Sequence, residues 1–203
     1  FLEGLDLTGK DVLDVGCGVG GCDLVLVEDY GAANVHGIDI EQPLIDRCNS
    51  RATAQGYGDQ LSYQLVSPGP FPIEDERFDV VFSKDALIHI EDKHALFRDV
   101  FRVLRPGGVF VASDWMRVDE NLPGPEMQTW IEAVGLSFGM HSPPFYEDAL
   151  DAAGFEKVAT RDRNEFLVTS LEQDISKFTD NYDELVRRTG GEADHYLVIW
   201  KTA

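Results

Sequence analysis

The feature that most constrains this chain is a glycine-rich turn that directly follows a short apolar segment. Residues 12–21 read Val-Leu-Asp-Val-Gly-Cys-Gly-Val-Gly-Gly. Gly16, Gly18 and Gly21 have the G-x-G-x-x-G spacing that joins a strand to a helix around a bound nucleotide. A second apolar segment leads to Asp39, about 20 residues further on, where a carboxylate can bind ribose hydroxyls. The pattern predicts a nucleotide-type cofactor site in a parallel α/β fold.

The rest of the chain alternates between strand and helix patterns. We predict strands at residues 11–16, 34–40, 61–66, 78–83 and 109–113, with two more at 157–162 and 196–202. We predict helices at residues 19–30, 43–55, 92–104, 123–139, 143–153 and 170–188. Residues 105–108 are expected to stop the third helix and turn the chain, and the apolar face of that helix is expected at Ala95, Leu96, Val100, Val103 and Leu104. This order predicts a doubly wound, Rossmann-like α/β fold whose seven-stranded sheet is mostly parallel, with an antiparallel closing strand.

Composition and charge narrow the class of protein. We expect one domain over residues 1–203, in which residues 115–155 form a lid insertion on the substrate side. The formal net charge of −20 disfavours a nucleic-acid partner, because an acidic surface repels phosphates. We find no apolar segment near the roughly 20 residues that span a bilayer and no signal peptide, so no membrane partner is expected. The three cysteines form no metal-like group, which favours a reduced, cytoplasmic protein without a metal.

Asp14 helps to distinguish between two cofactor classes. The glycine spacing alone fits a dinucleotide, whose pyrophosphate would lie at the helix N-terminus. Asp14 lies two residues before the first glycine and would repel that pyrophosphate. A ligand with an ammonium and a sulfonium group would instead be attracted to Asp14. An NAD(P)-dependent oxidoreductase remains the alternative.

Four motifs together resemble those of class I S-adenosylmethionine-dependent methyltransferases. They read VLDVGCGVGG, GIDI, FDVVFSKD and VLRPGGVF, in order, within residues 10–115. The resemblance implies S-adenosyl-L-methionine as cofactor and S-adenosyl-L-homocysteine as product. It places cofactor contacts at Asp14, Gly16, Cys17, Gly18, Gly20, Asp39, Ile40, Ser67, Pro68 and Lys84. Relatives usually carry an N-terminal helix over the cofactor, so we expect this helix outside residues 1–203 or replaced by another element.

The segment SKDALIHIEDKHALF, residues 83–97, carries the information on the methyl acceptor. It resembles the phosphoethanolamine N-methyltransferases and the sarcosine and dimethylglycine N-methyltransferases, in which the matching aspartate and histidine hold the amine and assist catalysis. Asp85 and His89 would share one face if the chain turns helically here. A histidine can take the proton that an attacking amine loses, and a carboxylate can stabilise the developing ammonium. The alternatives are a helix-capping role for Asp85 and a capping or core role for His89.

The resemblance is weaker after the fifth predicted strand. Residues 129–136 contain Trp130 but no arginine or tyrosine, so a phosphorylated amine would lack a clamp and is an unlikely substrate in our interpretation. Trp115 and Trp130 could instead bind a cationic amine by cation–π contact, or both could be ordinary core aromatics.

The predicted function is methyl transfer from S-adenosylmethionine to a small polar metabolite, with an amine nitrogen as the acceptor. Two alternatives remain open, an O- or C-methyltransferase of a small metabolite and a non-catalytic protein that binds the cofactor. The small-molecule substrate is the one partner that we expect. The oligomeric state does not follow from the sequence.

Overall fold

The computed structural model of this chain describes residues 2, 4–121, 123–134, 137–166, 168–170 and 172–173. The chain divides into two compact units. The first unit contains residues 1–119 and 138–156, and the second contains residues 120–137 together with the chain from residue 157 on. The predicted single domain with a lid at 115–155 stays a prediction.

The first unit contains a parallel sheet of five strands in the order β3-β2-β1-β4-β5. The strands are β1 (Asp11–Val15), β2 (Asn34–Asp39), β3 (Leu61–Leu65), β4 (Phe78–Lys84) and β5 (Leu104–Ser113). The chain moves outward from β1 through β2 to β3 and then returns to the other side of β1 with β4. The carboxyl ends of β1 and β4 therefore form the topological switch point, where folds of this kind bind ligands.

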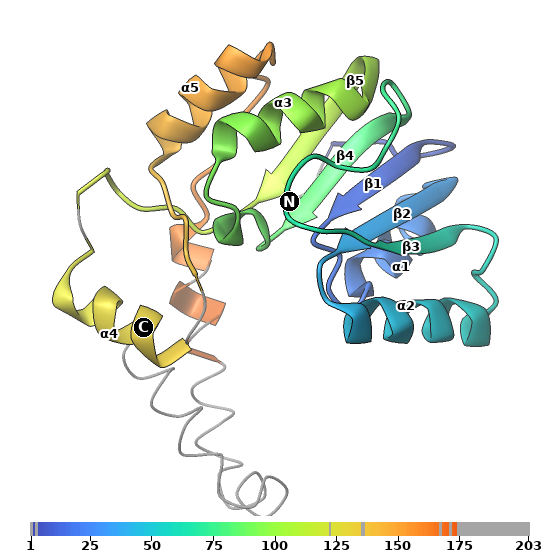
Figure 1. Cartoon of the computed structure of the whole chain (residues 1–203), viewed down its shortest axis with the longest axis horizontal. Helices are drawn as coiled ribbons and strands as arrows, with labels where there is room; N and C mark the ends of the chain where they lie inside the picture. The colour runs from blue at the N-terminus through green and yellow to red at the C-terminus, as the bar shows by residue number, and fades with distance from the viewer. Residues whose placement is uncertain are drawn as a thin grey trace, which may run out of the picture. The chain divides into compact units, whose positions relative to one another are not determined.

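Helices cover both faces of this sheet (Figure 1). Helices α1 (Gly21–Glu28) and α2 (Gln42–Gln55) lie on one face. On the other face lie α3 (Lys93–Val103) and α5 (Pro143–Ala153). A one-turn 3₁₀ helix, η1 (Leu87–His89), follows β4. Because both faces are covered, the central strands are apolar on both sides, as buried parallel strands are.

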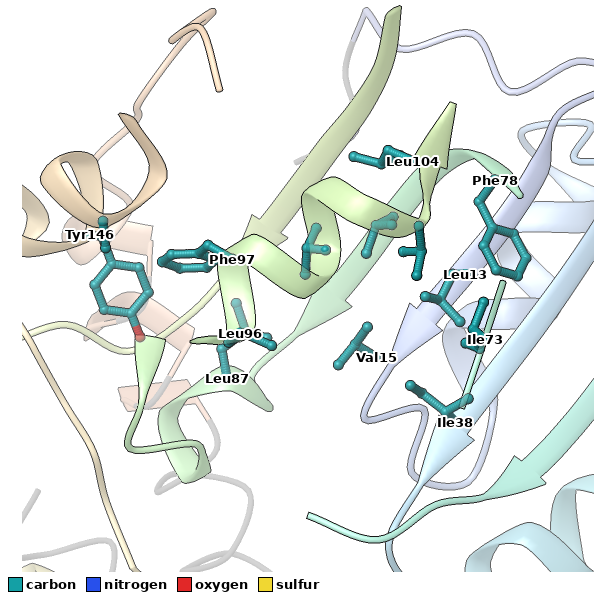
Figure 2. Packing of buried hydrophobic residues seen from close by; sticks show 14 residues of the cluster. Leu13, Val15, Ile38, Ile73, Phe78, Leu87, Leu96, Phe97, Leu104 and Tyr146 are labelled. Atoms are coloured by element: carbon teal, nitrogen blue, oxygen red, sulfur yellow. The ribbon is translucent and has the colours of Figure 1, made fainter. Parts of the chain in front are cut away.

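The larger apolar cluster joins the sheet to α3 and α5. Figure 2 shows Leu13 and Val15 of β1 and Ile38 of β2 at one end of the cluster, with Leu96 and Phe97 of α3 toward the other end, beside Leu87 and Tyr146. The second cluster is built on Val12, Val35 and Val80, which point to the opposite face of the same strands and pack against Leu26 of α1. Alternate strand residues thus serve opposite layers, which fixes the register of the sheet.

One predicted strand is wrong, and another lies outside the described residues. The described residues form five parallel strands and no antiparallel one, not the seven strands predicted. Residues 157–162 form no strand, and the side chain of Val158 is 93% exposed, so this segment has no core face to pack. The predicted strand 196–202 lies outside the described residues, as does the predicted helix 170–188 beyond residue 173.

The turn predicted at residues 105–108 is also corrected. These residues belong to β5, which begins at Leu104. Gly107 has a φ of 79°, and the pairing with β4 shifts its register between Phe78 and Val80. The third helix does stop just before these residues, at Val103, but the glycines make an irregularity within the strand and no separate turn.

The second unit includes α4 (Pro125–Val134). Its first turn is supported by the Gln128 side chain, whose Nε2 donates to the Pro123 carbonyl at 2.7 Å. Among the described residues, no helix has the length and apolar character that a bilayer crossing requires.

Candidate functional site

Several backbone hydrogen bonds hold the glycine-rich loop after β1. The amides of Gly16 and Cys17 both donate to the Ile38 carbonyl, at 2.9 and 3.1 Å, and the Gly20 amide donates to the Cys17 carbonyl at 2.8 Å. Gly16, Gly18 and Gly20 have φ of 76°, 54° and 66°. Side chains rarely adopt this left-handed conformation, so glycine is favoured at each of the three positions.

Asp39 lies at the end of β2, next to this loop. Its carboxylate accepts the Gly18 amide at 2.9 Å and the Glu41 amide at 3.0 Å. The neighbouring Ile40 side chain is 57% exposed beside the same loop, as an apolar surface for a ligand ring would be. The structure thus brings together Asp39, Ile40 and Gly18, three of the residues predicted to bind the cofactor.

Asp14 supplies a buried carboxylate beneath the loop. Its side chain is 2% exposed, and Asp23, at the start of α1, is fully buried. The Asp23 carboxyl lies in hydrogen-bonding reach of Asp14 and of the Tyr63 hydroxyl, whereas Asp14 Oδ1 has no hydrogen-bond partner among the described residues. Burial raises the pKa of Asp14 well above its ordinary value, and the nearby Asp23 carboxyl raises it further. A buried acceptor without a donor is costly, so Asp14 fits a cationic group of a ligand.

The glycine loop and the loop after β4 meet directly. A Cβ atom placed on Gly16 would lie 2.3 Å from the Cβ of Ala86, so the two loops are as close as a glycine allows. The Ser83 hydroxyl donates to the Val15 carbonyl at 2.7 Å and joins the ends of β4 and β1. The predicted cofactor loop and the predicted acceptor segment therefore adjoin at the switch point.

Asp85 begins the acceptor segment in an unusual backbone conformation. Its φ is 55°, its amide donates to the Ser113 carbonyl at 2.8 Å, and its carboxylate forms an ion pair with Lys84. It is 39% exposed and caps no helix, because η1 begins after Ala86 and α3 is capped by Asp92. The capping interpretation of Asp85 is wrong.

His89 ends η1 and is exposed, so it is not a core residue. Its ring lies 5.2 Å from the Phe138 ring. The helical face that Asp85 and His89 were expected to share is not formed, since Asp85 precedes η1. Both side chains nevertheless belong to the turn that adjoins Gly16.

A buried polar trio lies behind this turn, and the sequence analysis missed it. Lys93 is 1% exposed, and its Nζ donates to the carbonyls of Leu87, at 2.7 Å, and of Ile90. The Tyr146 hydroxyl donates to Asp114 Oδ2 at 2.7 Å. A signal was present: Lys93 stands three and four residues before Leu96 and Phe97, on the buried face of α3.

The other predicted residues belong to three separate parts of the chain. Ser67 and Pro68 are exposed in the loop after β3, and Trp115 is half-buried just after β5. Trp130 lies on α4 in the second unit, so its substrate-binding role stays a prediction. Within the described ranges, no group of three or more His, Cys, Asp or Glu side chains could hold a metal ion.

Comparison with known proteins agrees with this geometry. Residues 6–183 match the family described as Methyltransferase domain. Phosphoethanolamine N-methyltransferase 1 of Zea mays is 34% identical over 203 residues, which are 99% of this chain and 39% of the relative. Sterol 24-C-methyltransferase of Yarrowia lipolytica is 32% identical over 154 residues, 73% of this chain and 40% of that protein. The chain thus spans about two fifths of the length of these relatives.

A solved structure has the same fold. Phosphoethanolamine N-methyltransferase 2 of Haemonchus contortus, in complex with phosphomonomethylethanolamine and S-adenosylhomocysteine, matches with a TM-score of 0.88 at 21% identity. The match covers 98% of this chain and 46% of that chain. The fold, the glycine loop and the family match agree, and the chain belongs to the methyltransferase domain family.

Proposed function

We propose that this domain binds S-adenosylmethionine and transfers its methyl group to the nitrogen of a small polar amine. One observation carries the proposal. Gly16 of the glycine loop abuts Ala86, the residue after Asp85, so the donor loop and the acceptor turn adjoin. Methyl transfer depends on holding nucleophile and methyl group in line, and two adjoining loops can do this without a metal.

The chain's own residues fit the cofactor. Asp14, with a buried oxygen that lacks a donor among the described residues, would take the ammonium group. Asp39 and Ile40 would hold the ribose and adenine, and the glycine loop allows close backbone approach. When bound, S-adenosylmethionine supplies the electrophilic methyl group. Cys17, Cys22 and Cys48 are free thiols, which fits the cytoplasmic location that belongs to this proposal.

Asp85 and His89 would act on the acceptor. An amine must be unprotonated to attack a methyl group and becomes cationic as it does so. The exposed Asp85 carboxylate would hold the nitrogen and stabilise the developing charge. The exposed imidazole of His89 would accept or relay the departing proton. Trp115, just after β5, would offer its ring face to the cation.

The substrate that we favour carries no phosphate. The named relatives include a phosphoethanolamine enzyme and a sterol C-methyltransferase, so family membership does not choose the acceptor. Arg117 is the only arginine between residues 106 and 160. A single guanidinium is a weak clamp for a phosphate dianion. The net charge of −20 also attracts a cationic amine more strongly than an anionic phosphobase.

Two measurements test the proposal. Calorimetry with S-adenosylhomocysteine and with NAD should give binding of the former alone, and binding of NAD alone would refute the cofactor assignment. A methyl-transfer screen over ethanolamine, glycine, sarcosine, dimethylglycine and phosphoethanolamine should find the highest kcat/KM for an unphosphorylated amine. Preference for phosphoethanolamine, with a loss in Arg117→Gln, would replace our substrate with a phosphobase. Cofactor binding without turnover on any acceptor would favour the non-catalytic alternative.

A further inference from the structure

We infer that Lys93 is a positioning residue: its buried ammonium group fixes the turn that presents His89 to the acceptor. This inference rests on the proposed function only for the role of His89. The two hydrogen bonds from the Lys93 ammonium group to the turn, called the tether below, lie within the first unit, and they can be tested without a substrate.

The two carbonyls that Lys93 binds lie on either side of His89 in the sequence. Its Nζ donates to the carbonyl of Leu87, two residues before His89, and to that of Ile90, one residue after it. Between them, the Ile88 carbonyl accepts the Gly139 amide at 2.6 Å. One turn of 3₁₀ helix has few hydrogen bonds of its own. The side chain of Lys93 therefore supplies a large part of what holds this turn in shape.

Burial makes it implausible that Lys93 serves packing alone. The residue lies on the apolar face of α3 with Leu96, Phe97 and Val100, and an apolar side chain of similar length would fill the same space. Taking an ammonium group out of water carries a large desolvation penalty, and apolar replacements of buried charges often raise stability. A charge kept at such a position is best explained by the two carbonyls that it binds.

Three groups compensate the buried charge. The Asp114 carboxylate and the Glu91 carboxylate attract it, and the Tyr146 ring lies 5.5 Å from Nζ. Burial nevertheless outweighs these attractions and lowers the pKa of Lys93 to about 8. The ammonium form is therefore the main form at neutral pH, with all of its donors available to the turn.

Tyr146 connects the tether to a second helix. Its hydroxyl binds Asp114 at the end of β5, and its ring lies 5.7 Å from the Phe97 ring of α3. Figure 2 shows Tyr146 on α5 facing Phe97, with Leu87 of η1 nearby. Lys93, Asp114 and Tyr146 thus link α3, β5 and α5 behind one short turn.

Lys93→Met tests the tether, with Lys93→Arg as the conservative rescue. Val100→Ala is the matched control, because Val100 is buried on the same helix and has no polar contact with the turn. Hydrogen exchange of the amides of His89 and Ile90 should become about 10- to 100-fold faster in Lys93→Met, as expected when bonds to a charged donor are lost. Lys93→Arg should restore most of the protection. Val100→Ala should speed the exchange of these two amides no more than it speeds the exchange of amides in the sheet.

Activity provides the second measurement. Lys93→Met should lower kcat on the accepted amine by about tenfold while KM changes less and affinity for S-adenosylhomocysteine stays within about twofold. Unchanged exchange in a folded Lys93→Met protein would refute the tether. If Lys93→Met does not fold, Lys93→Gln, which keeps an amide donor without the charge, replaces it under the same criteria. Absence of turnover in the unmutated protein would refute the proposed function, while the exchange measurement would still decide the tether.

Discussion

The two loops that adjoin at Gly16 and Ala86 differ in what holds them. The glycine loop is held by backbone hydrogen bonds to β2, with three glycines in the left-handed conformation and the Asp39 carboxylate on one amide of the loop. The acceptor turn after β4 also has backbone hydrogen bonds, and the buried ammonium group of Lys93 binds two of its carbonyls. The glycine loop depends chiefly on residues that lack a side chain, and the acceptor turn depends in addition on a charged side chain from α3.

This difference determines which changes each loop tolerates. The glycine loop should fail when a Cβ atom is added to Gly16, because no space is left beside Ala86. The acceptor turn should loosen when the ammonium group that reaches it from α3 is removed. The cofactor side and the acceptor side of the site should therefore respond to different classes of mutation, which the following predictions test.

Gly16→Ala should have the largest effect. The new Cβ would lie 2.3 Å from the Ala86 Cβ, and φ is 76°. Strain and overpacking together should lower the free energy of unfolding by about 2–4 kcal/mol and abolish cofactor binding. Gly56→Ala is the matched control, with a φ of 82° and open space around the new atom, and should cost only about 1 kcal/mol. Urea unfolding measures the stability of both variants, and calorimetry with S-adenosylhomocysteine measures their cofactor affinity. Equal losses of stability in Gly16→Ala and Gly56→Ala would mean that the contact with Ala86 does not constrain the loop.

His89→Ala should follow, with an effect on the acceptor side alone. We expect kcat to fall about 100-fold, because a positioned proton acceptor is lost, while affinity for S-adenosylhomocysteine is unchanged. His94→Ala, an exposed histidine on α3 with its ring 5.7 Å from Phe145, is the control and should retain the kcat of the unmutated protein. Steady-state kinetics decide this prediction, and an unaltered kcat in His89→Ala would remove His89 from the mechanism.

Much of the fold could be predicted because its signals are local. The first four strands lie within one or two residues of their predicted bounds, since each is a short apolar run that ends at glycine or polar residues. The strand predicted at 157–162 failed because an alternating pattern needs a sheet to join, and Val158 is almost fully exposed. Gly107 suggested a turn of the chain after the third helix, but its left-handed conformation is accommodated inside β5.

The glycine loop could likewise be identified from the spacing of its glycines, because each takes a backbone conformation that favours glycine. The hydrogen bonds that hold the acceptor turn could not be identified in this way. Lysine on a helix is usually interpreted as facing water, and Ala95 was assigned to the buried face, whereas Ala95 is exposed and Lys93 and Phe97 are buried. The partner carbonyls of Lys93 carry no sequence signal at all, since any residue at positions 87 and 90 would supply them.

Asp14→Asn should affect stability and cofactor binding in opposite directions. The raised pKa of Asp14 means that the folded protein retains a proton that the unfolded chain releases above about pH 4. Stability therefore falls as pH rises through this window, and Asn should raise the free energy of unfolding at neutral pH and flatten its pH dependence. Cofactor affinity should fall about tenfold, because Asn cannot supply the carboxylate that would form when the ligand's ammonium group displaces the Asp14 proton.

Asp23→Asn is the control for this pair. Burial also raises the pKa of Asp23, so its removal should stabilise the protein in the same way. Asp23 lies on α1 rather than at the end of β1, and affinity for S-adenosylhomocysteine should stay nearly constant. Urea unfolding at pH 5 and pH 8, with calorimetry at each, measures both effects; equal affinity losses in the two variants would assign the ammonium site to the pair.

Asp92→Ala should have the smallest effect, and it tests whether the cap of α3 helps to hold the acceptor turn. Asp92 caps α3 by accepting the Ala95 amide at 2.9 Å, and its loss should lower the free energy of unfolding by about 1 kcal/mol. Asp92 and Lys93 are neighbours, but only Lys93 binds the carbonyls on either side of His89. Asp92→Ala should therefore lower the free energy of unfolding while kcat stays constant. A fall in kcat without a change in cofactor affinity would mean that the cap of α3, and not the buried ammonium group alone, holds the turn.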